Sequence, residues 1–189
     1  LINNKNKTYL SKNNNNILRI EHLSSIENSN IFILIREPFS HSKSLLKQHI
    51  NFLNQQNNDK FVLEYMNSLG HYEFGQNQKS FFSPGKYSEK TKLIYWLSEW
   101  QKTYKNILDE FNQNKKNNVF FVTYEGLCEN PEKLFNKVEE LYDLNLEYKQ
   151  SNFTNYNLYK KEQNFSNEET LLLEDCQKLY KIIKDKSII

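Results

Sequence analysis

The sequence contains no alanine, and only two of its 25 basic residues are arginines, Arg19 and Arg36. Asparagine and lysine are abundant instead, which indicates a general drift of composition toward Asn, Lys, Ile, Tyr and Phe. The run of four asparagines at 13–16 therefore needs no function of its own. Against this background, an arginine kept where lysine is the usual basic residue is a candidate for chemistry that lysine cannot perform.

The chain also lacks a charge excess and a long apolar run. Lys and Arg total 25 against 23 Asp and Glu, a formal net charge of +2. This balance argues against a polybasic nucleic-acid binder and against an acidic tail. No apolar run approaches the roughly 20 residues of a membrane span. We therefore expect neither nucleic acid nor a membrane span.

Cysteine is scarce too. Cys128 and Cys176 cannot build a disulfide framework, which favours a reducing compartment, and we expect the cytoplasm. No group of His, Cys, Asp and Glu has the spacing of a zinc site, so no metal is expected. The chain opens at Leu1 without a signal-peptide pattern, as the remainder of a longer protein would.

What the sequence does contain is aromatic residues and two short buried strands. The 13 Phe, 12 Tyr and 2 Trp offset a hydrophobic fraction of 38%. Consecutive apolar residues at 31–35 and 119–122 predict strands buried on both faces, and residues 8–11 predict a third, shorter strand. Helical spacing predicts the helices between and after them, at 17–26, 39–52, 61–69, 88–111, 131–142 and 166 onward. Alternating strands and helices predict an α/β fold with a parallel sheet in a single domain, with ligands at the carboxyl ends of the strands.

Polar residues stand at those strand ends. Arg36 follows the first buried strand, Pro38 fixes the turn, and Ser44 lies about two turns along the next helix. A planar guanidinium and a hydroxyl at such a junction suit a phosphate group. The alternative is that Arg36 pairs with Glu37 or caps a helix, and that Ser44 faces solvent.

The segment from Ile31 to Pro38, with Ser44 eight residues after Arg36, resembles the 3′-phosphate-binding segment of the sulfotransferases. These enzymes use 3′-phosphoadenosine-5′-phosphosulfate (PAPS) as sulfuryl donor. The resemblance implies that Arg36 and Ser44 hold the 3′-phosphate of the donor. It also implies a P-loop-hydrolase-like, three-layer α/β fold.

A second segment is similar to another signature of that family. Residues 119–127 read as a buried strand followed by Tyr-Glu-x-Leu, and Asn130-Pro131 then opens a helix. The resemblance implies that Tyr124 contacts the adenine, although a tyrosine packed at a sheet edge is the plainer interpretation. Glu125 is expected to accept hydrogen bonds that tie loops together.

Lys12 precedes Arg36 by the interval of the family's active-site lysine. The resemblance implies that Lys12 stabilises charge on the leaving phosphate, and an ordinary exposed lysine is the alternative. Some members carry a histidine base two residues later. Here that position is Asn14, which cannot accept the acceptor's proton.

The larger departure is the absence of the strand, loop and helix that bind the 5′-phosphosulfate. We expect this first element of the fold to lie upstream of Leu1, so that residues 1–189 form the C-terminal two-thirds of a sulfotransferase-like domain. The family's basic, Gly-rich C-terminal stretch is missing as well. Lys160 and Lys161 are weak candidates to replace that stretch in donor binding. The simpler explanation is that both are ordinary solvent-exposed lysines.

Between Gly70 and Gly75 lies a dense polar cluster. His71 and Glu73 are candidates to line an acceptor pocket or to supply a base near neutral pH, and they could equally stabilise the loop. His41 and His49 are expected to be exposed or cap-like. Trp96 and Trp100, four residues apart, are expected in the core.

These residues lead to the interpretation of an enzyme that transfers a sulfuryl group from PAPS to a hydroxyl or amine of a carbohydrate, lipid or small molecule. Two alternatives stay open. One is a P-loop kinase-like phosphotransferase, and the other is a non-enzymatic module that binds carbohydrate or protein.

Overall fold

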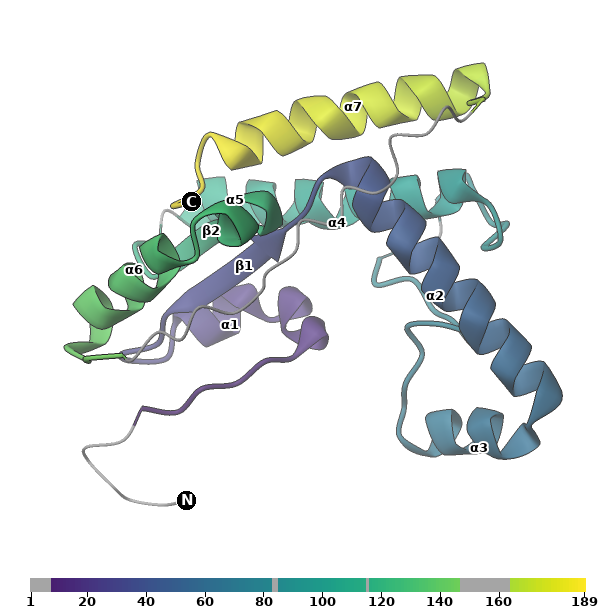
Figure 1. Ribbon diagram of the computed structural model, residues 1–189, viewed down its shortest axis with the longest axis horizontal. Helices are drawn as coiled ribbons and strands as arrows, with labels where there is room; N and C mark the ends of the chain where they lie inside the picture. The colour runs from purple at the N-terminus through teal and green to yellow at the C-terminus, as the bar shows by residue number, and fades with distance from the viewer. Residues whose placement is uncertain (1–7, 83–84, 115, 147–163) are drawn as a thin grey trace. The chain divides into compact units, whose positions relative to one another are not determined.

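A computed structural model describes residues 8–82, 85–114, 116–146 and 164–189 (Figure 1). These residues form two compact units. The first contains the chain up to Ile35, the segment that begins at Asn114 and includes residues 116–146, and the end of the chain from Ser187. The second contains residues from Arg36 to Gln113 and the C-terminal helix.

The first unit is built on two parallel strands. Strand β1 (Ile31–Ile35) pairs with β2 (Val119–Thr123) so that Ile31 lies opposite Val119 and Ile35 opposite Thr123. Their branched and aromatic side chains suit a pleated, buried surface, and Ile35 and Phe121 are fully buried. The last residues of the chain also pair with β2, because Ile188 N–H donates to Phe121 O at 2.9 Å.

Short helices precede β1 and follow β2 in the chain: η1 (Asn14–Leu18), α1 (Ile20–Ser24), α5 (Tyr124–Glu129) and α6 (Glu132–Tyr142). The Asn118 amide ties the turn after α1 to the start of β2, donating to the carbonyls of Ser24 and Ser29 at 2.9 Å each. Thr123 ends β2 and caps α5, since its hydroxyl accepts the Gly126 N–H at 3.0 Å.

The second unit is helical. Helix α2 (Pro38–Asn58) contacts both α3 (Lys60–Ser68) and α7 (Asn167–Lys184). Helix α4 (Leu93–Asn114) supplies the aromatic core. Its Trp96 ring packs 5.3 Å from the His49 ring of α2, and its Trp100 ring packs 6.4 Å from the Tyr180 ring of α7. Trp96 and Trp100 are both buried, as the sequence predicts.

The strand expected at residues 8–11 is wrong. Residues 8–13 have no regular structure, and Tyr9 and Leu10 are 88% and 92% exposed. A four-residue segment that finds no strand to pair with gains neither ladder hydrogen bonds nor burial. Lys12 therefore does not stand at the end of a strand.

Several boundaries also differ. Helix α2 continues through residues 53–58, beyond its predicted end at residue 52, because Gln56 packs inward and is buried. Helix α4 begins at Leu93 rather than Ser88. Strand β1 is less buried than predicted, since Leu34 is 49% exposed. The short helix α5 was not predicted.

The described residues confirm a mixed α/β protein with a parallel pair of strands. None of the helices in the described part of the chain is both long enough and apolar enough to cross a membrane.

Candidate functional site

The candidate residues are divided between the two units. Lys12 and Tyr124 belong to the first, while Arg36, Ser44 and the 71–73 cluster belong to the second. Within the second unit the structure brings together Arg36 with the first turns of α2, and His71 with Glu73. Lys160 and Lys161 lie outside the described residues.

Arg36 directly follows β1, and the turn after it is fixed from two sides. Its carbonyl accepts the indole N–H of Trp100 at 3.3 Å. Pro38 then starts α2 with the backbone angle that a first helical turn requires. Arg36 itself is half-buried. The guanidinium thus extends from a backbone that α4 holds in place.

The N-terminus of α2 is capped by the chain itself. The Glu37 carboxylate accepts the N–H groups of Phe39 and Ser40 at 3.1 and 2.7 Å. These are the backbone donors that an anion would otherwise use at a helix start. An anion beside this helix must therefore be held by side chains rather than by the helix terminus.

Ser44 lies four residues after Ser40 and three residues after His41, so it shares one stripe of α2 with both. Ser40 is buried and Ser44 is half-buried. Burial, and to a lesser extent the positive charge of Arg36, lower the pKa of His41 to about 4. His41 is thus neutral at pH 7, and Arg36 supplies the positive charge beside this stripe.

His41 and Ser42 each bury a polar atom. Among the described residues, the Nδ1 atom of His41 and the Oγ atom of Ser42 have no hydrogen-bond partner. Ser42 is fully buried and the ring of His41 packs 6.3 Å from that of Tyr104. The expectation of an exposed His41 is therefore wrong.

His49 is buried rather than exposed, with 2% of its surface accessible. Its Nδ1 atom accepts the backbone N–H of Gly75 at 3.2 Å, so it anchors the loop after α3. Burial, followed by the charge of Lys90, lowers the pKa of His49. The neutral imidazole that results is the form able to accept this hydrogen bond.

His71 and Glu73 lie together in that loop. The Nδ1 atom of His71 is 3.4 Å from a carboxylate oxygen of Glu73, and their side chains are 55% and 25% exposed. A carboxylate beside an imidazole fixes the orientation of the ring. The pair is accessible to a ligand, and it can equally hold the loop.

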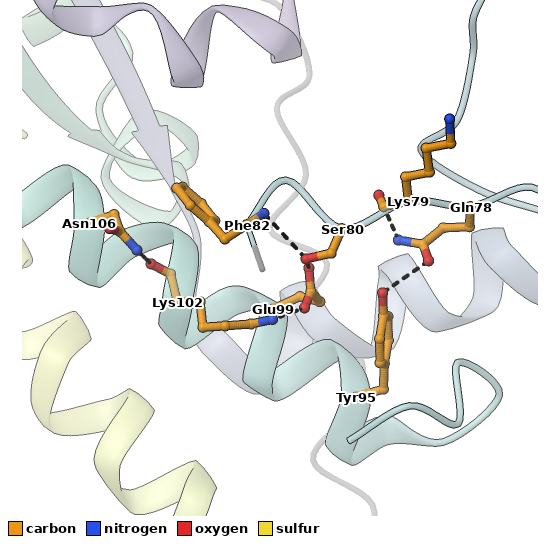
Figure 2. A network of polar contacts seen from close by, with 8 residues as sticks. All are labelled: Gln78, Lys79, Ser80, Phe82, Tyr95, Glu99, Lys102 and Asn106. Atoms are coloured by element: carbon orange, nitrogen blue, oxygen red, sulfur yellow. Dashed lines mark hydrogen bonds and ion pairs between the residues drawn. The ribbon is translucent and has the colours of Figure 1, made fainter. Parts of the chain in front are cut away.

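The continuation of the loop is joined to α4 by the polar network shown in Figure 2. The Ser80 hydroxyl donates to a carboxylate oxygen of Glu99 at 2.5 Å, and Lys102 forms an ion pair with the same carboxylate. The Tyr95 hydroxyl donates to the Gln78 side chain at 2.9 Å. Glu99 is only 11% exposed, so this carboxylate mainly ties the loop to the helix.

The two candidates of the first unit differ in their surroundings. Lys12 is exposed in the irregular segment before η1. Tyr124 is half-buried and is the first residue of α5, placed there by the Thr123 cap. Tyr124 thus follows directly the strand residue that pairs with Ile35.

Sequence reasoning missed the buried polar groups around the loop at 70–80. The burial of His49, Gln56 and Gln78 depends on partners 17 to 26 residues away, which no local pattern indicates. Among the residues that the structure describes, three or more potential metal ligands are nowhere grouped. Comparison of the chain with protein-family models, with curated proteins and with solved structures gives no match.

Proposed function

We propose that the chain is part of a sulfotransferase that transfers a sulfuryl group from PAPS to a hydroxyl or amine of an acceptor. The observation that carries the proposal is Arg36, one of only two arginines, which follows the parallel strand β1 and precedes a capped helix bearing Ser44. The same order of strand, arginine, proline and serine underlies the family resemblance. We extend the proposal to a P-loop-hydrolase-like fold for the complete domain.

The residues of α2 suit the 3′-phosphate of the donor. Glu37 occupies the first N–H groups of the helix, so Arg36 supplies the charge and Ser44 a hydroxyl donor. Because His41 is neutral at pH 7, it contributes no charge of its own to a bound phosphate. An arginine binds a phosphate through two parallel hydrogen bonds, which the abundant lysines of this chain cannot reproduce.

The other roles come from the resemblance alone. Tyr124 contacts the adenine, Lys12 stabilises charge on the leaving phosphate, and Lys160 and Lys161 add contacts to the donor. His71, oriented by Glu73, removes the proton from the acceptor hydroxyl. The donor supplies the sulfuryl group, and catalysis consists mainly of positioning and charge stabilisation.

The test is binding of 3′,5′-bisphosphoadenosine and of 5′-AMP, measured by isothermal titration calorimetry. Arg36→Ala is expected to weaken bisphosphoadenosine binding by about 1.5–3 kcal/mol, roughly 10- to 150-fold, because a charge-assisted hydrogen bond is lost. Binding of 5′-AMP, which lacks the 3′-phosphate, should not change. Arg36→Lys should restore only part of the loss.

Arg19 offers a matched control, because it is the only other arginine and is exposed. Arg19→Ala should bind both nucleotides as the unaltered protein does. Equal bisphosphoadenosine affinity in Arg36→Ala and Arg19→Ala would remove Arg36 from the proposal. Absence of radiolabelled sulfate transfer by the full-length protein to any of a saccharide, lipid and phenol panel would argue against the enzyme itself.

A further inference from the structure

The loop from Gly70 to Ser80 is irregular but firmly built. Three buried polar side chains hold it: His49 accepts the Gly75 N–H, Gln56 accepts the Gln76 N–H at 2.7 Å, and Gln78 is bonded to Tyr95. Gly75 adopts a φ of +84°, and a Cβ atom there would collide with the Gln56 side chain. Such a loop presents its outward side chains in a fixed arrangement.

A pocket of about 580 Å³ lies between this loop and the end of α3. It is lined by Asn67 of α3 and by Tyr72, Asn77, Gln78 and Lys79 of the loop. Gln78 is buried and already bonded through both ends of its amide. The groups left to meet a ligand are therefore two exposed amides, one half-buried aromatic ring and one ammonium group.

The two amides hold each other. The Asn77 amide N–H donates to the Asn67 oxygen at 2.8 Å. Each asparagine has two donor hydrogens and one carbonyl oxygen, so this pair keeps N–H donors and a carbonyl acceptor available side by side. If the O and N positions of both amides are exchanged, the same number of N–H donors and carbonyl acceptors remains available to a ligand. Neighbouring hydroxyls on a sugar ring likewise both donate and accept hydrogen bonds.

The Tyr72 ring and the Lys79 ammonium group are the other two groups available to a ligand in the pocket. Lys79 places its Nζ atom 4.1 Å from the centre of the Tyr72 ring, which holds the long side chain over the pocket. Among the described residues Lys79 makes no ion pair with a carboxylate, and Glu73, the one acid between Gly70 and Ser80, pairs with His71. The half-buried tyrosine offers an apolar edge to the C–H groups of a sugar, and Lys79 offers a positive charge to an acidic substituent.

We propose that the pocket formed by Asn67, Tyr72, Asn77, Gln78 and Lys79 binds a saccharide that carries a carboxylate. The amide pair binds adjacent hydroxyls, and Lys79 binds the carboxylate. The role of this saccharide as the sulfuryl acceptor rests on the proposed function, but its binding does not. Nothing in the pocket requires the nucleotide donor.

The test uses the methyl glycosides of glucuronic acid and of glucose, which differ in the carboxylate. Binding to the whole chain is followed by ¹H–¹⁵N NMR titration without nucleotide. We expect the glucuronide to bind at least several-fold more tightly, with the largest shifts at residues 67–79. Lys79→Gln should remove this preference while leaving glucoside binding in place, and Asn77→Leu should weaken both about tenfold, the loss of one hydrogen bond.

Lys105→Gln and Asn106→Leu provide matched controls, since both residues are exposed on α4 and outside the pocket. Both should bind the sugars as the unaltered chain does. Thermal melts show that each variant is folded. No saturable shifts with either sugar at millimolar concentration, or equal glucuronide preference in Lys79→Gln, would overturn the proposal. Stronger binding of an acidic peptide than of the glucuronide would do so as well.

The nucleotide titration separates this proposal from the previous one. Sugar binding without bisphosphoadenosine binding would support the pocket and contradict the sulfotransferase. Bisphosphoadenosine binding without sugar binding would leave the enzyme with a different acceptor and overturn the pocket.

Discussion

At the scale of single residues, burial makes His41 and His49 reporters of pH. The native protein holds the His41 imidazole neutral with a pKa of about 4, while the unfolded chain protonates it near the ordinary value of 6.5. The unfolded state therefore takes up more protons between these values. Stability contributed by the neutral form is complete above about pH 6.5 and is lost as the pH falls toward 4.

We therefore predict that the free energy of unfolding falls by about 1–2 kcal/mol between pH 7 and pH 5 through His41. His49, whose pKa is also lowered, adds to the loss. Urea denaturation at pH 7 and at pH 5 measures this fall in the free energy of unfolding. In His41→Gln, which cannot be protonated, the drop should be smaller. An equal drop in the variant would show that other groups cause it.

At the scale of elements, the N-terminus of α7 could be predicted from the sequence. Ser166 accepts the Glu169 N–H at 3.1 Å, and Glu169 returns the contact by accepting the Ser166 N–H at 3.0 Å. This reciprocal capping box is the pattern that the spacing of Ser166 and Glu169 predicts. Glu168 and Glu169 in the first turn, and Lys181 and Lys184 in the last, also suit the helix dipole.

Removing this cap should weaken the helix. Ser166→Ala is expected to lower the free energy of unfolding by about 0.5–2 kcal/mol, because one N–H loses its partner. Ser166→Asp should preserve stability, since aspartate is an equally good cap. Urea denaturation followed by circular dichroism compares the two. A loss in Ser166→Asp as large as that in Ser166→Ala would assign the effect to something other than capping.

Other elements show which features of the fold local sequence patterns can predict and which they cannot. The two strands were predictable because runs of branched and aromatic residues need a sheet to bury them. The extension of α2 to Asn58 was not, because its last turns are polar and are kept helical by Gln56, which the loop at 70–80 covers. The strand predicted near Tyr9 failed for the converse reason, since a local pattern cannot supply a partner strand.

At the scale of the whole molecule, the two cysteines report on different units. Cys176 of α7 is fully buried against α4, where its thiol contacts the Leu97 carbonyl at 3.5 Å. Burial, with the nearby charges of Asp175 and Glu37, raises the pKa of this thiol to about 12. Cys128 lies half-buried in the first unit.

We predict that a thiol reagent modifies Cys128 in the native protein and spares Cys176. Labelling of Cys176 requires opening of the helical unit, so its rate should rise with urea in parallel with the change in Trp96 and Trp100 fluorescence. Intact-protein mass spectrometry of Cys128→Ser isolates the Cys176 signal. Rapid labelling of that variant in buffer would contradict the packing of α7 on α4.

Some features of the candidate sites could be predicted from the sequence and others could not. Arg36 and Tyr124 could be named from the sequence because each follows a predictable strand, and Ser44 because it lies on the helix after Arg36. Lys12 was named from its spacing to Arg36 alone, since the strand predicted before it does not form. The pair His71 and Glu73 could be named because both lie in one short segment. The neutral state of His41 and the Asn67–Asn77 pair could not, because burial of His41 and the folding of the loop against α3 are features of the tertiary structure.

The sequence alone determined the parallel pair of strands, most of the helices and the isolated arginine after β1. These follow from local periodicity, capping and composition, which act over a few residues. Only the tertiary structure decided that His49, Gln56 and Gln78 are buried and that the loop at 70–80 is fixed over a polar pocket. The physical reason is that a buried polar group must find a partner, and here each bond joins the loop to a helix residue 17 to 26 positions away in the chain.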